Sequence, residues 1–193
     1  RLISLAGADK TRVLLAALLL SPHIPLLFMG EEFGETHPFL FFTDFHGELA
    51  KAVREGRAKE FSGHAGHDET VPDPNDVNTF IRSKLDWNKI ATDEGKTWLR
   101  YTRHLLTLRH RYIVPLLHPG GAVEGHVLKT APGMVAVSWR FPSGTLSLAL
   151  NIGTKPVDLP ALAGETRFAW PELNDVLPPN GIVVRFADGE ASL

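Results

Sequence analysis

An uninterrupted apolar run that ends in a glycine and two glutamates constrains this chain more than any other feature. Residues 24–29 are apolar at every position, and Gly30, Glu31 and Glu32 follow directly. A short run that is apolar on both alternating faces is typical of a strand buried on both sides, as in a parallel sheet or barrel. We therefore expect an inward-facing strand that presents the glutamates at its carboxyl end.

The segment before this run predicts a helix. Residues 9–20 are mostly apolar, Asp9 is a candidate helix cap, and Ser21-Pro22-His23 is expected to end the helix. A helix, a buried strand and a polar loop together form part of a repeating βα unit. One such unit cannot close a barrel, so we expect the chain to begin inside a larger fold.

The middle of the chain predicts helices separated by a long loop. Residues 48–60 form a charged amphipathic pattern with an apolar stripe at Leu49, Ala52 and Val53. Residues 62–76 are polar and form a long loop for a compact domain. A second helical pattern starts at residue 93 or 94 and runs to about residue 110, with Pro115 and Pro119-Gly120-Gly121 expected to end it. Its apolar face repeats every three or four residues, at Trp98, Tyr101, Leu105, Leu108 and Tyr112.

The last third of the chain changes to a strand pattern. Apolar segments at residues 123–130, 134–141, 145–152 and 182–186 are separated by Gly- and Pro-rich turns. This spacing indicates an antiparallel β-sandwich. The aromatic side chains are spread over separate strands, so we expect them in the core; they are Trp139, Phe141, Phe168, Trp170 and Phe186. The predicted fold is thus α/β plus all-β, with one domain over residues 1–118 and a second over residues 119–193.

Composition excludes several classes of partner. The chain has 193 residues, a formal net charge of −2 and no block of like charges, which argues against nucleic acid or an anionic membrane as the main partner. The apolar stretch at residues 14–20 is too short to span a bilayer. The chain has no cysteine, so we expect neither disulfides nor thiolate metal sites, and a cytoplasmic protein is favoured.

The two glutamates and the phenylalanines that follow form the candidate site. Carboxylates accept hydrogen bonds from sugar hydroxyls, and aromatic rings stack on sugar rings; the C-terminal end of a barrel strand is where such sites are built. Four phenylalanines lie between residues 39 and 45. From the residues alone, a second interpretation stays open, in which the glutamates are solvated and the phenylalanines are core.

The same stretch resembles a known enzyme family. Phe28-Met29-Gly30-Glu31-Glu32-Phe33-Gly34 is similar to the eighth-strand region of the α-amylase superfamily, with Glu32 at the position of the family glutamate. The run from Pro38 to Phe45 (PFLFFTDF) resembles malto-oligosyltrehalose trehalohydrolases and, less closely, glycogen branching enzymes. Residues 48–61, residues 71–87 and the helix WLRYTRHLLTLR at residues 98–109 agree with the trehalohydrolase resemblance.

The resemblance implies the end of a (β/α)8 barrel, helices and a C-terminal β-sandwich. It implies a retaining glycoside hydrolase that cleaves the α-1,4 bond next to the trehalose end of maltooligosyltrehalose and releases trehalose, without a cofactor. The catalytic carboxylates are expected upstream, in the remainder of the enzyme, so no catalytic residue is assigned here. The expected substrate-binding residues are Glu31, Glu32, Phe33, Phe39 and Asp44. A branching enzyme and a non-catalytic carbohydrate-binding fragment remain the alternatives.

No metal site is expected. Asp73, Asn75 and Asp76 do not fit a calcium-binding loop and are explained by turn and cap chemistry. His64 and His67, with Asp68 beside the second, lack a further ligand and lie among glycines, so a zinc site is not predicted. Trp87 is expected to pack rather than to bind sugar.

Overall fold

The computed structural model describes residues 1–62, 71–118, 123–173 and 176–189. The helices are α1 (Leu2–Ala6), α2 (Ala8–Leu20), the 3-10 turn η1 (Glu31–Phe33), α3 (Gly47–Ser62), α4 (Val77–Ser83), the 3-10 turn η2 (Trp87–Ala91), α5 (Asp93–Leu108), the π-helix η3 (Arg109–Ile113) and α6 (Val114–Leu117). The strands are β1 (Glu124–Ala131), β2 (Met134–Phe141), β3 (Gly144–Asn151), β4 (Val157–Asp158), β5 (Glu165–Trp170), β6 (Val176–Leu177) and β7 (Gly181–Asp188).

The strands form a five-stranded antiparallel sheet. Its order is β1-β2-β3-β7-β5, so β1 and β5 are the edges. Turns that contain Gly133 and Gly144 join the first three strands into hairpins, and Gly133 has the positive φ of 76° that such a turn requires. The four strands predicted from the sequence are confirmed as β1, β2, β3 and β7. The strand β5 and the two-residue strands β4 and β6 were not predicted.

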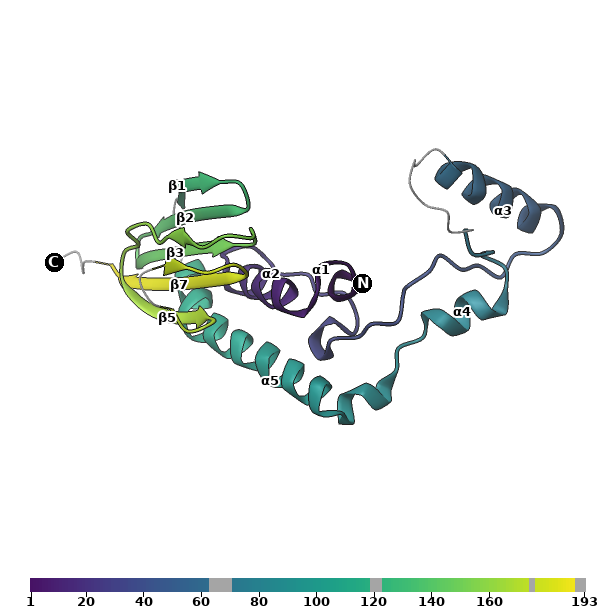
Figure 1. The fold of residues 1–193 in the computed structure, drawn as a ribbon, viewed down its shortest axis with the longest axis horizontal. Helices are drawn as coiled ribbons and strands as arrows, with labels where there is room; N and C mark the ends of the chain where they lie inside the picture. Colours follow the sequence, from purple (N-terminus) through teal and green to yellow (C-terminus); the bar gives the residue numbers. More distant parts are fainter. Residues whose placement is uncertain (63–70, 119–122, 174–175, 190–193) are drawn as a thin grey trace.

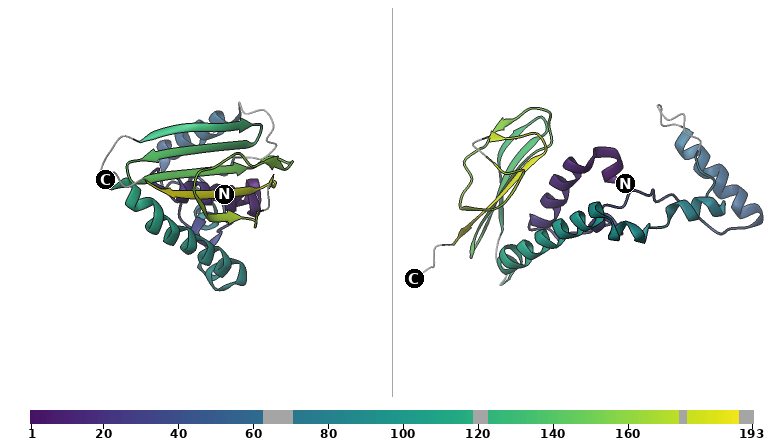
Figure 2. Two further views of the ribbon diagram at one scale, coloured as in Figure 1. Left: turned by 90° about the vertical axis from the view of Figure 1, so that its left-hand side faces the viewer. Right: turned by 60° about the horizontal axis from the view of Figure 1, so that its bottom comes forward.

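Helices α2 and α5 cover one face of this sheet. In Figure 2, α2 lies behind the strands in the left view, and α5 runs below α2 in the right view. One apolar cluster joins the three layers, and it includes Leu19 of α2, Leu105 of α5 and Leu148 of β3. The apolar stripe predicted for the long helix is confirmed, because Trp98 and Leu105 are fully buried and Tyr101 and Leu108 pack against the cluster. The aromatic residues of the strands also lie in or against this cluster, as expected.

The opposite face of the sheet is covered differently. In the described residues, β4 and β6 pair as a small two-stranded sheet, and Leu177 of β6 packs with Ala149 and Val183. The central strand β3 is therefore buried on both sides. The antiparallel character of the predicted domain is confirmed. The expected sandwich is not a pair of comparable sheets, because helices occupy the place of one layer.

One arginine joins the end of α2 to the end of α5. The Arg109 guanidinium is almost fully buried and donates to the carbonyl oxygens of Leu19 (2.9 Å), Ser21 (2.7 Å) and His23 (2.7 Å). The last carbonyls of a helix lack intrahelical partners, so this side chain satisfies them. Burial lowers the pKa of Arg109 from its ordinary value, although so strong a base stays charged.

Two helix ends differ from the sequence prediction. The N-cap of α2 is Gly7, and Asp9 lies one position inside the first turn, where it pairs with Arg12 at 2.9 Å. Pro115 does not terminate the long helix. It lies at the start of α6, directly after the π-helix η3, and the helical path continues past it to Leu117.

The apolar run at residues 24–29 is not a strand in this structure. The run is extended but pairs with no strand of the described chain, and Ile24 and Leu26 are 93% and 87% exposed. A strand needs a neighbour that satisfies its backbone groups and covers its side chains. The inward-facing strand that we expected as part of a barrel is therefore not formed in this structure.

Candidate functional site

The two predicted glutamates lie on a single tight turn. Gly30 and Gly34 flank η1 with φ angles of 89° and 72°, in the left-handed region that glycine adopts without strain. A Cβ at Gly34 would lie 2.5 Å from the Trp98 side chain. The turn is thus shaped by its two glycines and pressed against the core helix α5.

Both glutamates stabilise this turn through their own backbone. One Glu31 oxygen accepts a hydrogen bond from the Phe28 amide at 3.0 Å, and one Glu32 oxygen accepts from the Gly30 amide at 2.9 Å. Each carboxylate retains further acceptor capacity for a ligand hydroxyl. Phe33, between the glutamates and Gly34, has 0% exposure and contacts the Trp87 ring at 5.9 Å. A fully buried ring has no face for a sugar, so Phe33 packs the turn instead of binding substrate here.

A third glutamate, which the sequence did not reveal, is buried directly after the turn. Glu35 is 1% exposed and accepts hydrogen bonds from the amides of Thr36 (2.7 Å), His37 (2.8 Å) and Asp86 (2.6 Å). The His37 ring nitrogen Nδ1 also lies 3.0 Å from its Oε1 atom. No periodicity marks Glu35 in the sequence, because its burial depends on Asp86, 51 residues further along the chain.

These contacts also affect the ionisation of Glu35. Burial alone would raise the pKa of the Glu35 carboxyl. The hydrogen bonds from three backbone amides and from His37 outweigh burial, so the pKa of Glu35 is lowered from its ordinary value. The carboxylate is therefore ionised at neutral pH, which suits an acceptor and does not suit a general acid.

Beyond Glu35, two segments run side by side away from the core. The Leu40 amide donates to Ser83 Oγ at 3.0 Å, and the Thr43 amide donates to the Pro74 carbonyl at 2.7 Å. We call residues 36–46 and 71–86, with helices α3 and α4, the arm; Figure 1 shows it reaching away from the sheet. The two stretches that carried the trehalohydrolase resemblance, residues 38–45 and 71–87, are thus neighbours in space.

A row of aromatic rings lies along the base of the arm. Phe39 contacts Phe28 edge to face at 5.1 Å, Phe42 lies 5.8 Å from Phe39, and Phe80 lies 5.1 Å from Phe42. Phe28, Phe39 and Phe80 each keep two fifths or more of their surface exposed. Exposed rings held by neighbouring rings can offer a face to a sugar, and Phe39 is one of these rings.

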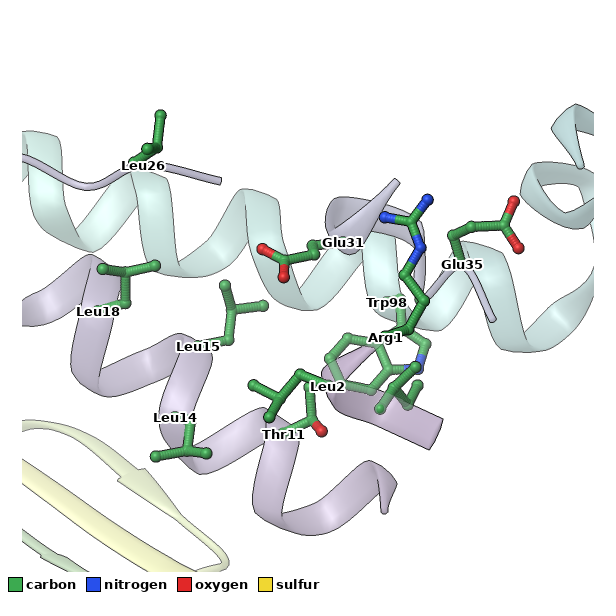
Figure 3. A pocket seen from close by; sticks show the side chains of 12 residues that line it. Arg1, Leu2, Thr11, Leu14, Leu15, Leu18, Leu26, Glu31, Glu35 and Trp98 are labelled. Carbon is green, nitrogen blue, oxygen red and sulfur yellow. The ribbon is translucent and has the colours of Figure 1, made fainter. Parts of the chain in front are cut away.

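The turn and helix α2 together border a pocket of about 190 Å³. Leu14, Leu15 and Leu18 line one side and Trp98 lies at one end. Figure 3 shows Glu31 and Glu35 at this pocket with their carboxylates pointing in opposite directions. Arg1 closes the rim by donating to the carbonyls of Met29 (2.6 Å) and His37 (2.8 Å). Of the five predicted site residues, Glu31 lines this pocket.

Asp44 lies apart from the turn. It is exposed and sits near the outer end of the arm, just before α3. Its neighbours Thr43 and Phe45 are tied to Asn75 by hydrogen bonds of 2.9 Å and 3.3 Å to Asn75 Oδ1. The structure therefore brings Glu31, Glu32 and Phe39 to the base of the arm and leaves Asp44 further out, just before α3.

The described residues show neither a metal centre nor a membrane-spanning segment. Within them, no three His, Asp or Glu residues cluster closely enough to hold a metal ion. Asp73 and Asp76 act in turns and caps, as expected, because Asp73 accepts from the Asn75 amide and Asp76 caps α4. His64, His67 and Asp68 lie outside the described residues. No helix of the described chain is long and apolar enough to cross a bilayer.

Comparison with known proteins identifies the family, although no family model matches the chain. The chain is 49% identical over 104 residues to a malto-oligosyltrehalose trehalohydrolase of Deinococcus radiodurans. It is 37% identical over 158 residues to the one of Brevibacterium helvolum and 33% identical over 165 residues to the one of Arthrobacter ramosus. The last two matches cover 81% and 85% of the chain. The chain belongs to the malto-oligosyltrehalose trehalohydrolase family. It spans 17%, 26% and 27% of the length of these three relatives.

Solved structures agree with this family. A candidate alpha amylase from Salmonella typhimurium shares 64% sequence identity, with a TM-score of 0.92 over 97% of this chain and 32% of that one. The trehalulose synthase MutB from Pseudomonas mesoacidophila superimposes with a TM-score of 0.61 over 96% of this chain, at 17% identity. The second match shows the shared fold alone. Both extend far beyond the region that this trehalohydrolase-family chain covers.

Proposed function

We propose that this chain is the C-terminal part of a malto-oligosyltrehalose trehalohydrolase. Its residues 1–118 would complete a catalytic (β/α)8 barrel, and residues 119–193 would form the domain that follows it. The observation that carries this proposal is the identity of 33–49% to relatives that bear this enzyme name. The exposed apolar run at residues 24–29 supports it, because such a run gains stability when neighbouring strands cover it.

The proposed reaction is hydrolysis with retention of configuration. One carboxylate attacks the anomeric carbon while a carboxylic acid protonates the leaving oxygen, which breaks the α-1,4 bond and frees trehalose. Water then displaces the enzyme carboxylate, and the former acid accepts the proton of that water. We place both groups in the part of the enzyme that precedes this chain.

The chain's own contribution would be to bind the trehalose end. Glu31 and Glu32 have acceptor capacity for sugar hydroxyls, and the Phe39 ring is half-exposed beside Phe28. A site that rejects a linear maltooligosaccharide must fit the bent 1,1-linked disaccharide. The turn at residues 30–34 and the base of the arm supply shape and polar groups suited to that role.

A matched pair of phenylalanines tests this assignment. Phe39 and Phe41 are each 48% exposed and lie on the same segment, but Phe39 packs on Phe28 whereas Phe41 lies under Arg57 of α3, 4.6 Å from the guanidinium carbon. Phe39→Ala in the full-length enzyme should lower kcat/KM for maltotriosyltrehalose by about tenfold, equivalent to about 1.4 kcal/mol of stacking. Phe41→Ala should stay within about twofold. Equal effects of the two variants would remove Phe39 from the binding role.

The Salmonella structure supports a second candidate function. Its name as a candidate alpha amylase, at 64% identity, fits an enzyme that hydrolyses α-1,4 bonds of ordinary maltooligosaccharides. Product analysis separates the two functions. A trehalohydrolase releases trehalose from maltotriosyltrehalose and acts poorly on maltopentaose, whereas an amylase cleaves both at similar rates.

A further inference from the structure

The Glu35 carboxylate connects two segments that are far apart in the sequence. Its Oε1 atom accepts from the amides of Thr36 and His37, which open the arm. Its Oε2 atom accepts from the Asp86 amide, where the second segment of the arm returns to the core. Each oxygen therefore holds a different segment, and the side chain closes the base of the arm.

Glu35 also contacts the turn that carries the two predicted glutamates. A Cβ placed on Gly30 would lie 2.7 Å from the Glu35 Cβ, so the stem of Glu35 packs directly on the turn backbone. The carboxylate points away from the leucines of the pocket (Figure 3). The aliphatic part of Glu35 thus contacts the turn, and its carboxylate bonds to the arm. The carboxylate oxygens do not point into the pocket.

The aromatic row depends on the same connection. Phe39 lies between the Glu35 contact and the Leu40–Ser83 contact, the next hydrogen bond between the two segments. A change at Glu35 would allow residues 36–39 to move relative to Phe28 and to the turn. Binding sites require their contact groups within about half an ångström of the productive geometry.

We infer that Glu35 is a positioning residue that sets the preference of the enzyme for trehalose-ended substrates. This inference rests on the proposed function. Glu35 holds the turn with Glu31 and the segment with Phe39 in one fixed relation, and this relation shapes the trehalose end of the site. The bond-breaking carboxylates lie outside this chain under the same proposal, so cleavage of an ordinary maltooligosaccharide depends less on Glu35.

A single isosteric substitution breaks the connection. The Gln side chain has the size of Glu but accepts at one atom and donates at the other. In a Glu35→Gln variant, an amide NH2 group must face either the Asp86 amide or the Thr36 and His37 amides, and two donors then oppose each other. The variant therefore loses the hydrogen bonds to one of the two segments, and it leaves no cavity because Gln has the size of Glu.

The test compares two substrates in the full-length enzyme. Glu35→Gln should lower kcat/KM for maltotriosyltrehalose at least tenfold more than kcat/KM for maltopentaose. A role in folding alone would reduce the active fraction and lower both values by the same factor. Glu165→Gln, at a mostly exposed carboxylate that pairs with Arg167 on the edge strand β5, should leave both values unchanged. An unchanged ratio of the two values in Glu35→Gln overturns the inference.

A second variant covers the case in which Glu35→Gln does not fold. Ser83→Ala removes the acceptor of the Leu40 amide and should shift the same ratio in the same direction, by about threefold. Hydrogen exchange should show faster exchange at the Leu40 amide in this variant. A wild-type enzyme that releases no trehalose overturns the proposed function. A wild type that releases trehalose, with an unaltered ratio in Ser83→Ala, overturns the positioning role alone.

Discussion

Two regions of the molecule are stabilised by different kinds of contact. One is the sheet with its two covering helices, and the other is the arm. In the first region, apolar side chains from α2, α5 and the strands form one continuous cluster. In the arm, single polar groups join its two segments at Glu35, Ser83 and Asn75, and the aromatic rings between them stay half-exposed. The sheet and its two helices therefore supply most of the stability of this chain, and the arm carries its candidate binding surface.

Two tryptophans give the largest expected contrast. Trp98 on α5 is fully buried, whereas Trp87 at the base of the arm is 64% exposed. Trp98→Ala should destabilise the protein by roughly 3–5 kcal/mol, because it leaves a large cavity beside the α2 leucines. Trp87→Ala should cost about 1 kcal/mol or less. Unfolding midpoints of the purified proteins in urea would check both values. Similar losses in the two variants would contradict the expected difference between the core and the arm.

Loss of the Arg109 connection between α2 and α5 should cause the second-largest loss of stability. Arg109→Met keeps most of the side-chain length but leaves the carbonyls of Leu19, Ser21 and His23 without their donor. We expect a loss of roughly 2–4 kcal/mol in the free energy of unfolding. Arg111→Met, an exposed position on the same helical stretch, should change it by less than about 0.5 kcal/mol. Equal losses would mean that the three carbonyls do not need Arg109.

Substitution of the buried Glu35 carboxylate should have a smaller effect on stability, and this effect should depend on pH. The pKa of Glu35 is lowered on folding, so its stabilisation is present above the ordinary pKa of 4.5 and is lost as pH falls toward the lowered value. Glu35→Gln should therefore cost about 1–3 kcal/mol at pH 7 and progressively less below pH 4.5. Thermal midpoints of both proteins across this range test it. His37 and Asp86 also face Glu35, so His37→Asn serves as the control for a histidine contribution.

The smallest effect should come from the edge of the sheet. Val127 on the edge strand β1 is 66% exposed, while Val184 on β7 is buried. Val127→Thr should change stability by no more than about 0.5 kcal/mol, whereas Val184→Thr buries a hydroxyl at a cost of about 1–3 kcal/mol. Equal losses would show that the edge strand and the central strand contribute equally to stability, despite their different burial.

Local patterns in the sequence predicted the core region well. The spacing of Trp98, Leu105 and Leu108 depends on helix geometry alone, and Gly133 and Gly144 mark hairpin turns that need no distant partner. Strand β5 was not predicted because its first three residues are polar and only Phe168 to Trp170 are apolar, and β4 and β6 are too short to show a period.

The site was less predictable because its key contacts are long-range. The family resemblance drew attention to Glu31 and Glu32, and Phe39 is exposed as a binding residue requires. Glu35 could not be distinguished from a solvated glutamate until Asp86 was placed beside it. Residues 24–29 were expected to be buried, but burial of an apolar run depends on neighbours that its own sequence does not specify.

Product analysis of the full-length enzyme with maltotriosyltrehalose shows whether the enzyme is a trehalohydrolase. A trehalohydrolase releases trehalose and maltotriose together in equal amounts from the start of the reaction. Release of glucose, maltose and other short products without trehalose, or transfer of chains to form branches, would contradict this function.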